Sequence, residues 1–313
     1  MPDFLHRRKD FDQLLSVVAD KERITTTLVE KDYWITHCLW GLKRQEFEFE
    51  LKGGTSLSKG FGIIKRFSED IDIRFEPPEK LEVMTGKNQN SPRQIESRRL
   101  FYEWLAKEIE IPDVTVSRAT EYDDSRFRNA GILLIYETRT KELEGVKPAV
   151  LLEVGFDDTT PNTAVDISSW ALDAARASGA DFADNQAQGI LCYNPEYTFV
   201  EKLQTISTKY RKFKETGRLP SNFLRHYSDV CSLLDVPSVL EFIGTGPYEE
   251  RKKQRFPSAD EQRIAKNPAF LFENKAEFEQ LDKEYRRTAA LYYAGQTSLA
   301  DIASKVRKYI DKL

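Results

Sequence analysis

The sequence has few of the residues that build disulfide frameworks and metal centres. Its 313 residues include three cysteines, Cys38, Cys192 and Cys231, which are far apart and in no paired spacing. This spacing predicts neither a disulfide framework nor a zinc motif, and we expect buried thiols in a reducing compartment. Only three histidines are present, so a histidine-rich metal site is not expected.

Long apolar runs are also lacking. The longest uncharged ones, such as GILLIY from Gly131, have the length of a strand and are too short to span a bilayer. The N-terminal stretch MPDFLHRRKDFDQLL has no apolar core of signal-peptide length. We therefore expect a soluble, cytoplasmic protein with no membrane partner.

The chain carries no excess of positive charge, because its net charge is −4 with 31% charged residues. A globally basic nucleic-acid binder is not indicated, although local basic patches are compatible with this balance. The apolar fraction of 40% and the aromatic fraction of 12% are sufficient for a buried core. The length fits one large domain or two ordinary ones.

Several common phosphate and nucleophile motifs are missing. The stretch GGTSLSKG has Ser58 where a P-loop requires its second glycine. The sequence shows no G-x-G-x-x-G dinucleotide fingerprint and no G-x-S-x-G nucleophile elbow. A nucleotide site would therefore have to be built in another way.

The hydrophobic patterns predict an α+β protein. Strand-like runs precede residue 157, namely FEFELK, IDIRF, VTVSR, GILLIYETR and PAVLLEVGF, and we expect the last two to form a hairpin. Helical patterns dominate afterwards. The prediction is an α/β domain over residues 1–165, with a mixed sheet of about five strands and flanking helices, followed by a helical domain over residues 166–313.

Two aspartates carry the most specific chemistry. Asp70 and Asp72 are two residues apart on a predicted strand, so both side chains point to one face while Ile71 and Ile73 face the core. Two carboxylates at this spacing repel each other unless a cation lies between them. Mg²⁺, or Mn²⁺, would relieve the repulsion and bridge substrate phosphates.

A glycine turn precedes this strand. Gly53 and Gly54 would allow the backbone to approach a phosphate, and Thr55 and Ser56 would add hydroxyl donors at the start of a short helix. A third carboxylate, Glu153, lies among apolar residues of a predicted strand. It is either a metal ligand or an exposed position on an edge strand.

The stretch GGTSLSKGF…RFSEDIDI resembles the first motif of the DNA polymerase β-like nucleotidyltransferases, and most closely that of the AbiEii/AbiGii nucleotidyltransferase toxins. The resemblance implies that Asp70 and Asp72 are catalytic and, with Glu153, hold metal ions. Nucleotide binding is expected at Gly53, Gly54, Thr55, Ser56, Lys59, Arg66 and Lys202.

Later motifs of the same group are also similar. The tripeptide Glu201-Lys202-Leu203 and the pattern from Arg225 to Asp229 correspond to its E-K-L and R-x-x-x-D motifs. The resemblance implies that Lys202 holds nucleotide phosphates. It implies also that Lys202 and Asp229 are catalytic and that Arg225 supports Asp229, so the helical domain would contribute to the active site.

The resemblance implies an NTP-dependent toxin that transfers NMP to an RNA acceptor, the 3′ end of tRNA, in a toxin–antitoxin or phage-defence (abortive-infection) system with an antitoxin encoded nearby. A nucleotidyltransferase acting on a small molecule or a protein is an alternative, and a non-catalytic nucleotide- or RNA-binding module is another.

Two clusters of basic residues are relevant to whether the acceptor is RNA. A basic stretch follows Lys202, and RKKQR begins at Arg251. These residues could line an RNA backbone, with Tyr210 or Phe213 available to stack on bases, or could be solvated helix faces. The basic residues of the stretch are Lys209, Arg211, Lys212, Lys214 and Arg218.

Overall fold

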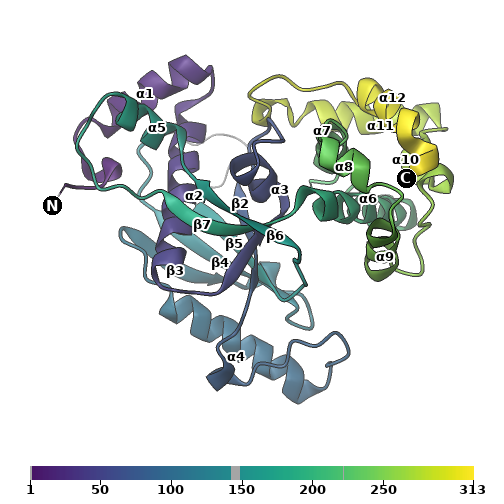
Figure 1. Ribbon diagram of the computed structural model, residues 1–313, viewed down its shortest axis with the longest axis horizontal. Coiled ribbons are helices and arrows are strands. Elements are labelled where there is room, and N and C mark those ends of the chain that lie inside the picture. The colour runs from purple at the N-terminus through teal and green to yellow at the C-terminus, as the bar shows by residue number, and fades with distance from the viewer. Residues whose placement is uncertain (1, 142–148, 221) are drawn as a thin grey trace. The chain divides into compact units, whose positions relative to one another are not determined.

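A mixed seven-stranded sheet lies at the centre of the α/β region, counted over residues 2–141, 149–220 and 222–313, which the computed structural model describes (Figure 1). The spatial order is β3-β4-β5-β2-β1-β7-β6. The strands are β1 (Phe49–Lys52), β2 (Asp70–Phe75), β3 (Val114–Ala119), β4 (Asn129–Tyr136), β5 (Ala149–Gly155), β6 (Asn162–Ile167) and β7 (Ala187–Tyr193).

Strand β2 lies near the middle of this sheet. It pairs antiparallel with β1 and parallel with β5, while β1 also pairs parallel with β7. The remaining pairs, β3–β4, β4–β5 and β6–β7, are antiparallel. The predicted hairpin of β4 and β5 is therefore confirmed, although the middle of its connection lies outside the described residues.

The alternation of β2 separates a buried face from a polar face. Ile71 and Ile73 are fully buried, whereas Asp70 and Asp72 are partly exposed on the opposite side, as the period-two pattern predicts. The buried face carries also Phe75, which contacts Phe101 of the helix α4 (Pro92–Glu108). The sheet thus buries its apolar side under helices and leaves the carboxylates on the other side.

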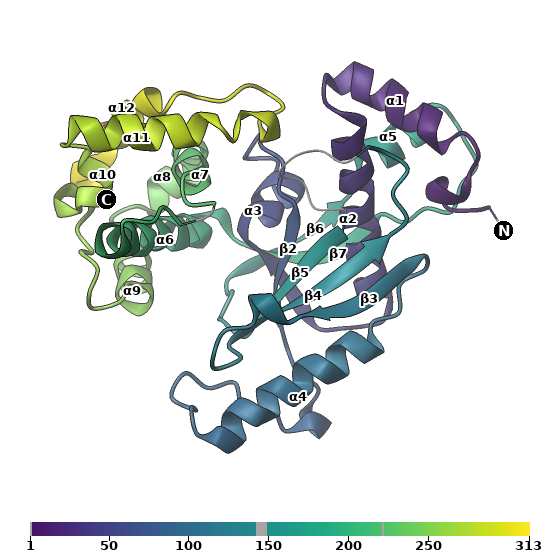
Figure 2. The ribbon, with the colours of Figure 1, turned by 180° about the vertical axis from the view of Figure 1, so that it is seen from behind.

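Figure 2 shows the helices of the α/β region, and two of them have clear sequence signals at their starts. Thr25 caps α2 by accepting a hydrogen bond from the Leu28 amide, and Ser91 with Gln94 forms a capping box at α4. The helices are α1 (Phe11–Glu22), α2 (Thr26–Arg44), α3 (Gly53–Thr55, continued by a π turn to Gly60), α4 (Pro92–Glu108) and α5 (Trp170–Ala177).

The chain divides into two compact units. The first contains the chain up to Gly60 together with Ser68–Tyr193, and the second contains Phe61–Phe67 and Asn194–Leu313. The first unit extends past the predicted boundary at residue 165, because the strands β6 and β7, which are joined through α5, complete its sheet. These strands raise the count from the predicted five to seven. Strand β7 pairs with β1, which is remote in sequence, so local patterns did not indicate it.

Helices form the second unit. Pro195 begins the long helix α6, and Gly217 ends it with a positive φ of 69°. The segment Phe61–Phe67 joins this unit through a hydrogen bond from the Phe67 amide to Leu291. The helices are α6 (Pro195–Thr216), α7 (Arg225–Leu233), α8 (Pro237–Phe242), α9 (Gly246–Arg255), α10 (Pro268–Leu271), α11 (Lys275–Arg286) and α12 (Leu299–Tyr309).

Candidate active site

One row of residues crosses four strands on the polar face of the sheet. Asp72 of β2 lies opposite Glu153 of β5 and opposite Lys52 of β1, and Glu153 lies opposite Gly131 of β4. Neighbouring strands are about 4.8 Å apart, so the side chains in this row are immediate neighbours. The structure therefore brings Asp72 and Glu153 together, with Asp70 two residues before Asp72 on the same face.

The carboxylates strongly affect each other's charge. The negative charge on Asp72, then burial, then the charge on Asp70 raise the pKa of Glu153 to about 8, from 4.5. A hydrogen bond with Asp72 favours the protonated form further. The acidic row therefore favours the protonated form of Glu153, because neighbouring carboxylates repel each other.

This coupling predicts an unusual pH dependence. The folded-state pKa of Glu153 is raised, so the stability tied to its proton is full below pH 4.5 and is lost as the pH rises through about 8. We expect Glu153→Gln, which keeps the hydrogen-bonding shape without this titration, to melt at a higher temperature than the wild type at alkaline pH. The gap should widen from about pH 5 to pH 9 in thermal melts with EDTA.

A matched control is Glu22→Gln, because Glu22 is an exposed carboxylate at the end of α1 and is not part of the sheet. Its melting curve should follow the wild type at every pH. Parallel curves for Glu153→Gln and the wild type would contradict the raised pKa of Glu153.

Lys52 is a residue of this row that sequence reasoning missed. It ends β1 opposite Asp72, and its charge lowers the pKa of Glu153, against the effect of the aspartates. The alternation in FEFELK predicts that Glu50 and Lys52 share the polar face of the strand. It does not show which strand pairs with this one, so the contact of Lys52 with Asp72 could not be predicted. The lysine places one positive charge beside the carboxylates.

The glycine turn lies directly against Asp72. Gly53 has a φ of +73°, and a Cβ there would overlap the Asp72 carboxylate oxygen. Glycine is therefore required both for the backbone conformation and for the close approach.

We expect Gly53→Ala to lose transfer activity by at least an order of magnitude. The left-handed conformation costs about 1–2 kcal/mol, and the added methyl must displace Asp72. Gly179→Ala is the matched control, because Gly179 has a φ of +72° with no atom near its Cβ position. It should lose similar stability in denaturant titrations but retain activity, and equal activity in both variants would contradict this reading.

Thr55 and Ser56 are both fully buried. The Thr55 hydroxyl donates to the Asp70 carbonyl, and the Ser56 hydroxyl lies 3.5 Å from the Tyr193 carbonyl. Their side chains therefore tie the turn to β2 and to the end of β7. Donors for a phosphate at this turn would come from the backbone around Gly53 and Gly54.

Lys59 follows the same turn. Its ammonium is paired with Asp32 of α2, and the other Asp32 oxygen accepts a hydrogen bond from the Trp170 amide at 2.9 Å. Both side chains of the ion pair are at least nine-tenths buried. This pair fastens the turn to α2, and a contact of Lys59 with nucleotide stays a prediction.

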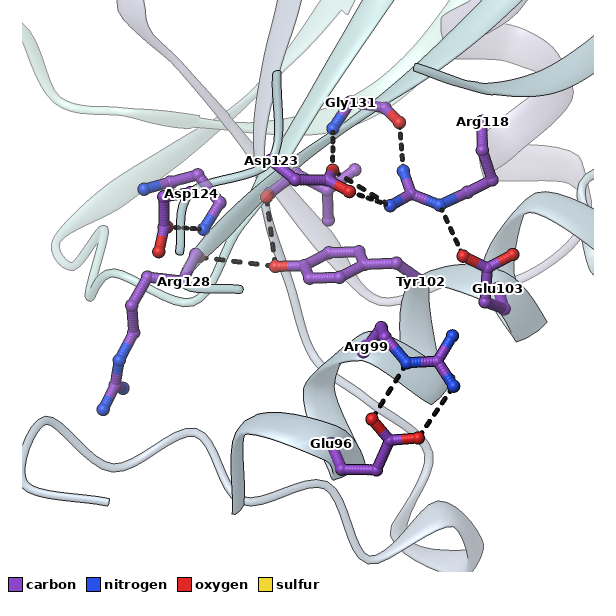
Figure 3. A network of polar contacts seen from close by, with 11 residues as sticks. Glu96, Arg99, Tyr102, Glu103, Arg118, Asp123, Asp124, Arg128 and Gly131 are labelled. Atoms are coloured by element: carbon purple, nitrogen blue, oxygen red, sulfur yellow. Dashed lines mark hydrogen bonds and ion pairs between the residues drawn. The ribbon is translucent and has the colours of Figure 1, made fainter. Parts of the chain in front are cut away.

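The strand that carries Glu153 is held by a polar network (Figure 3). The Tyr102 hydroxyl lies 3.3 Å from the carbonyl of Val154, the residue after Glu153. Arg118 binds the carboxylate of Asp123 and donates to the Gly131 carbonyl. A Cβ on Gly131 would lie 2.9 Å from the Ala119 carbonyl, so glycine allows this close strand contact. The network fixes β4 and β5 beside the carboxylates.

A second cluster of predicted site residues lies in the helical unit. Asp229 of α7 is fully buried and accepts two hydrogen bonds from Arg66, each 2.7 Å long, and its Oδ2 lies 2.9 Å from the Lys202 ammonium of α6. Burial alone would raise the pKa of Asp229, but Arg66 and Lys202 offset this, and its pKa lies well below the ordinary value.

The structure thus brings together Arg66, Lys202 and Asp229, which are widely separated in sequence. The guanidinium that holds Asp229 comes from Arg66, in the segment Phe61–Phe67. The sequence pattern had suggested Arg225, one helical turn away, for this task. The two clusters belong to different compact units, and the prediction that they act in one active site stays a prediction.

The basic stretches differ from the prediction. Tyr210 and Phe213 are buried, so they do not offer rings to bases. The Tyr210 hydroxyl donates to Glu277 of α11. The expected stacking role is therefore wrong, because helical spacing directs both rings into the core of the unit.

Many of the cations in these stretches are paired with acids. Arg211 binds Asp260, and Arg251 and Arg255 both bind Glu201. Lys214 is paired with Glu277. Lys212 and Arg218 are exposed. Ion pairing thus reduces the positive charge that these helices offer to a nucleic acid.

Among residues 2–141, 149–220 and 222–313, no helix is long and apolar enough to cross a membrane. Within the same ranges, no group of three or more His, Cys, Asp or Glu side chains is arranged so that it could hold a metal ion. The metal-binding role of Asp70, Asp72 and Glu153 therefore stays a prediction.

A mixed sheet with a glycine turn before two aspartates on a central strand is the arrangement expected of a nucleotidyltransferase, and the family comparison agrees. Residues 42–310 match the family model described as "Nucleotidyl transferase AbiEii toxin, Type IV TA system". The chain belongs to this family of toxin nucleotidyltransferases. The family implies a nucleotide substrate and an antitoxin partner.

The chain is also similar to a solved structure. That structure is described as an antigenic nucleotidyltransferase-like protein from Paracoccidioides brasiliensis. The identity is 15%, the TM-score is 0.39, and the match covers 72% of this chain and 86% of the other. No curated protein matches the chain.

Proposed function

We propose that this toxin transfers a nucleotidyl group from an NTP to an RNA acceptor, the 3′ end of tRNA, and so blocks translation. The observation that carries the proposal is the pairing of Asp72 with Glu153 beside the turn at Gly53. In the transfer, a bond forms between an acceptor hydroxyl oxygen and the α-phosphorus. The bond from that phosphorus to the bridging oxygen of the β-phosphate breaks, and pyrophosphate leaves.

Carboxylate oxygens are the ligands that a divalent cation such as Mg²⁺ prefers, and the side chains of the acidic row would have to converge further to hold one, since no group of three is so arranged in the described residues. The negative charge on Asp72 raises the pKa of Glu153, and a cation between the two carboxylates would offset that repulsion. Asp70, Asp72 and Glu153 would hold Mg²⁺ or Mn²⁺. When bound, the ion would neutralise phosphate charge and lower the pKa of the attacking hydroxyl.

The protein's own residues would position the nucleotide. Backbone amides at Gly53 and Gly54 would approach the triphosphate, and Lys202 would neutralise one of its phosphates. Arg66 holds Asp229 in one orientation, which keeps the Lys202 ammonium in place.

An RNA acceptor would use the exposed cations of the helical unit, including Lys212 and Arg218. The family assignment supports a cellular target whose modification is toxic, and a role in phage defence would follow from it. The antitoxin is expected to be encoded nearby.

A small-molecule or protein acceptor is a second candidate. The observation that favours it is the pairing of Arg211, Arg251 and Arg255 with acids, which leaves less charge for an RNA backbone. Such an acceptor would need no extended basic surface.

A labelling assay tests the proposal. The purified protein is incubated with magnesium, total cellular RNA and each labelled NTP in turn, beside Asp72→Asn. We expect a labelled band at tRNA size with the wild type only. Label on a protein or a small molecule would replace the RNA acceptor, and no label from any NTP would contradict transferase activity under these conditions.

A further inference from the structure

His226 stands apart from the other polar side chains of the helical unit. It lies on α7, three residues before Asp229, so the two side chains share one side of the helix. Both of its ring nitrogens are buried, and neither has a hydrogen-bond partner in the part of the chain that the structure describes. A neutral imidazole has one N–H donor and one acceptor, and burying both unpaired is unfavourable.

Four charged side chains act electrostatically on the His226 ring. They are Lys202 and Lys209 from α6, Asp229 from α7 and Arg66 from the segment Phe61–Phe67. Burial, followed by Lys202 and Lys209, lowers the pKa of His226 well below 6.5, so the ring is neutral at physiological pH.

The same neighbours explain why the ring's donor is unused. Lysine and arginine side chains are donors only. The carboxylate of Asp229 is already engaged by Arg66 and Lys202. The missing partner is therefore a group that presents acceptor oxygens and tolerates several cations, which describes a phosphate.

We propose that His226 donates a hydrogen bond to a phosphate oxygen of the bound nucleotide, beside Lys202. The inference rests on the proposed function for the identity of the ligand, and it adds a residue that sequence reasoning did not select. In this arrangement, Arg66 and Asp229 fix the Lys202 ammonium, and the imidazole adds a directed, uncharged donor. The phosphate would give the ring N–H an acceptor, so ligand binding would stabilise the helical unit.

The test measures binding of inorganic tripolyphosphate to the full chain by calorimetry in EDTA, so that no metal contributes. His226→Phe keeps a planar ring without nitrogens and should weaken binding by about 10- to 100-fold, the range for a hydrogen bond to a charged group. His226→Gln, which keeps a donor, should recover part of the affinity. His37→Phe is the matched control, because His37 is buried but already bound to Pro112 and Asn185. It should leave the affinity unchanged.

A spectroscopic readout covers the case in which His226→Phe does not fold. The chain has three histidines, so their imidazole resonances can be assigned by substitution. Tripolyphosphate should shift the His226 resonances in the wild type and leave those of His37 in place. In turnover assays, His226→Phe should raise the KM for NTP more than it lowers kcat.

The outcomes separate this inference from the proposed function. Tripolyphosphate binding that depends on His226, without nucleotidyl transfer, would support the phosphate site and contradict the proposed function. Transfer that proceeds normally in His226→Phe, with unchanged tripolyphosphate affinity or an unshifted imidazole, would overturn the role of His226 alone.

Discussion

Asp72→Asn is expected to abolish nucleotidyl transfer while the protein stays folded. Asp72 lies between Glu153 and Lys52 in the row that crosses the sheet, and it packs on the turn at Gly53. Asparagine keeps the shape but removes the negative charge that would hold a cation against the phosphates. Losing one such electrostatic group costs about 100- to 1,000-fold in rate, and losing a metal ligand should cost at least as much.

The measurement is initial-rate transfer of labelled nucleotide, with a thermal melt of the same sample. The metal-free variant should melt no lower than the wild type, because removing the charge of Asp72 relieves its repulsion with Glu153. Asp166→Asn is a suitable control, since Asp166 is an exposed carboxylate on β6 of the same sheet. Transfer by Asp72→Asn within tenfold of the wild type would exclude Asp72 from the reaction.

Asp229→Ala is expected to lower the free energy of unfolding of the helical unit by about 3–5 kcal/mol, the usual cost of removing one partner from a buried ion pair. The substitution leaves Arg66 and Lys202 buried without their anion; their side chains are only 6% and 9% exposed. Chemical denaturation followed by circular dichroism would measure the loss. Activity should fall too, because Lys202 loses the group that orients it.

Two further variants separate the stabilisation due to the buried ion pair from the effect of truncating any aspartate. Asp235→Ala removes an exposed carboxylate that is paired with Lys305, and it should cost less than about 1 kcal/mol. Adding Arg66→Leu to Asp229→Ala should recover part of the loss, because one unpaired buried cation disappears. Equal losses for Asp229→Ala and Asp235→Ala would show that the buried pair does not stabilise the unit.

Local patterns predicted those parts of the site that depend on neighbouring residues. The alternation of apolar and polar residues in IDIRF placed Asp70 and Asp72 on the polar face of β2, and the burial of Ile71 and Ile73 confirms it. The same reasoning could not show that Asp72 lies opposite Glu153, because strand register depends on pairing between β2 and β5, far apart in the chain.

Long-range pairing also explains the remaining differences. Arg66 and Asp229 are 163 residues apart, and Lys59 and Asp32 are 27 apart, so no spacing rule links either pair. Tyr210 and Phe213 looked available to stack because they lie in a basic helix. Their burial depends on which face of α6 the neighbouring helices cover, which the sequence of α6 alone does not specify.

The division of the chain has a consequence for the protein as a module. The chain passes between the two compact units at Gly60–Phe61, again at Phe67–Ser68, and again at Tyr193–Asn194. Truncation after Tyr193 would leave Phe61–Phe67 without Leu291, its hydrogen-bond partner, and Asp229 would be lost to Arg66. The helical unit is therefore built from two separate segments of the chain, and a single gene fusion could neither add nor exchange it. Recombination that replaces it would have to rewrite the short segment between the glycine turn and the aspartates as well, so the two parts are expected to have been inherited as one piece.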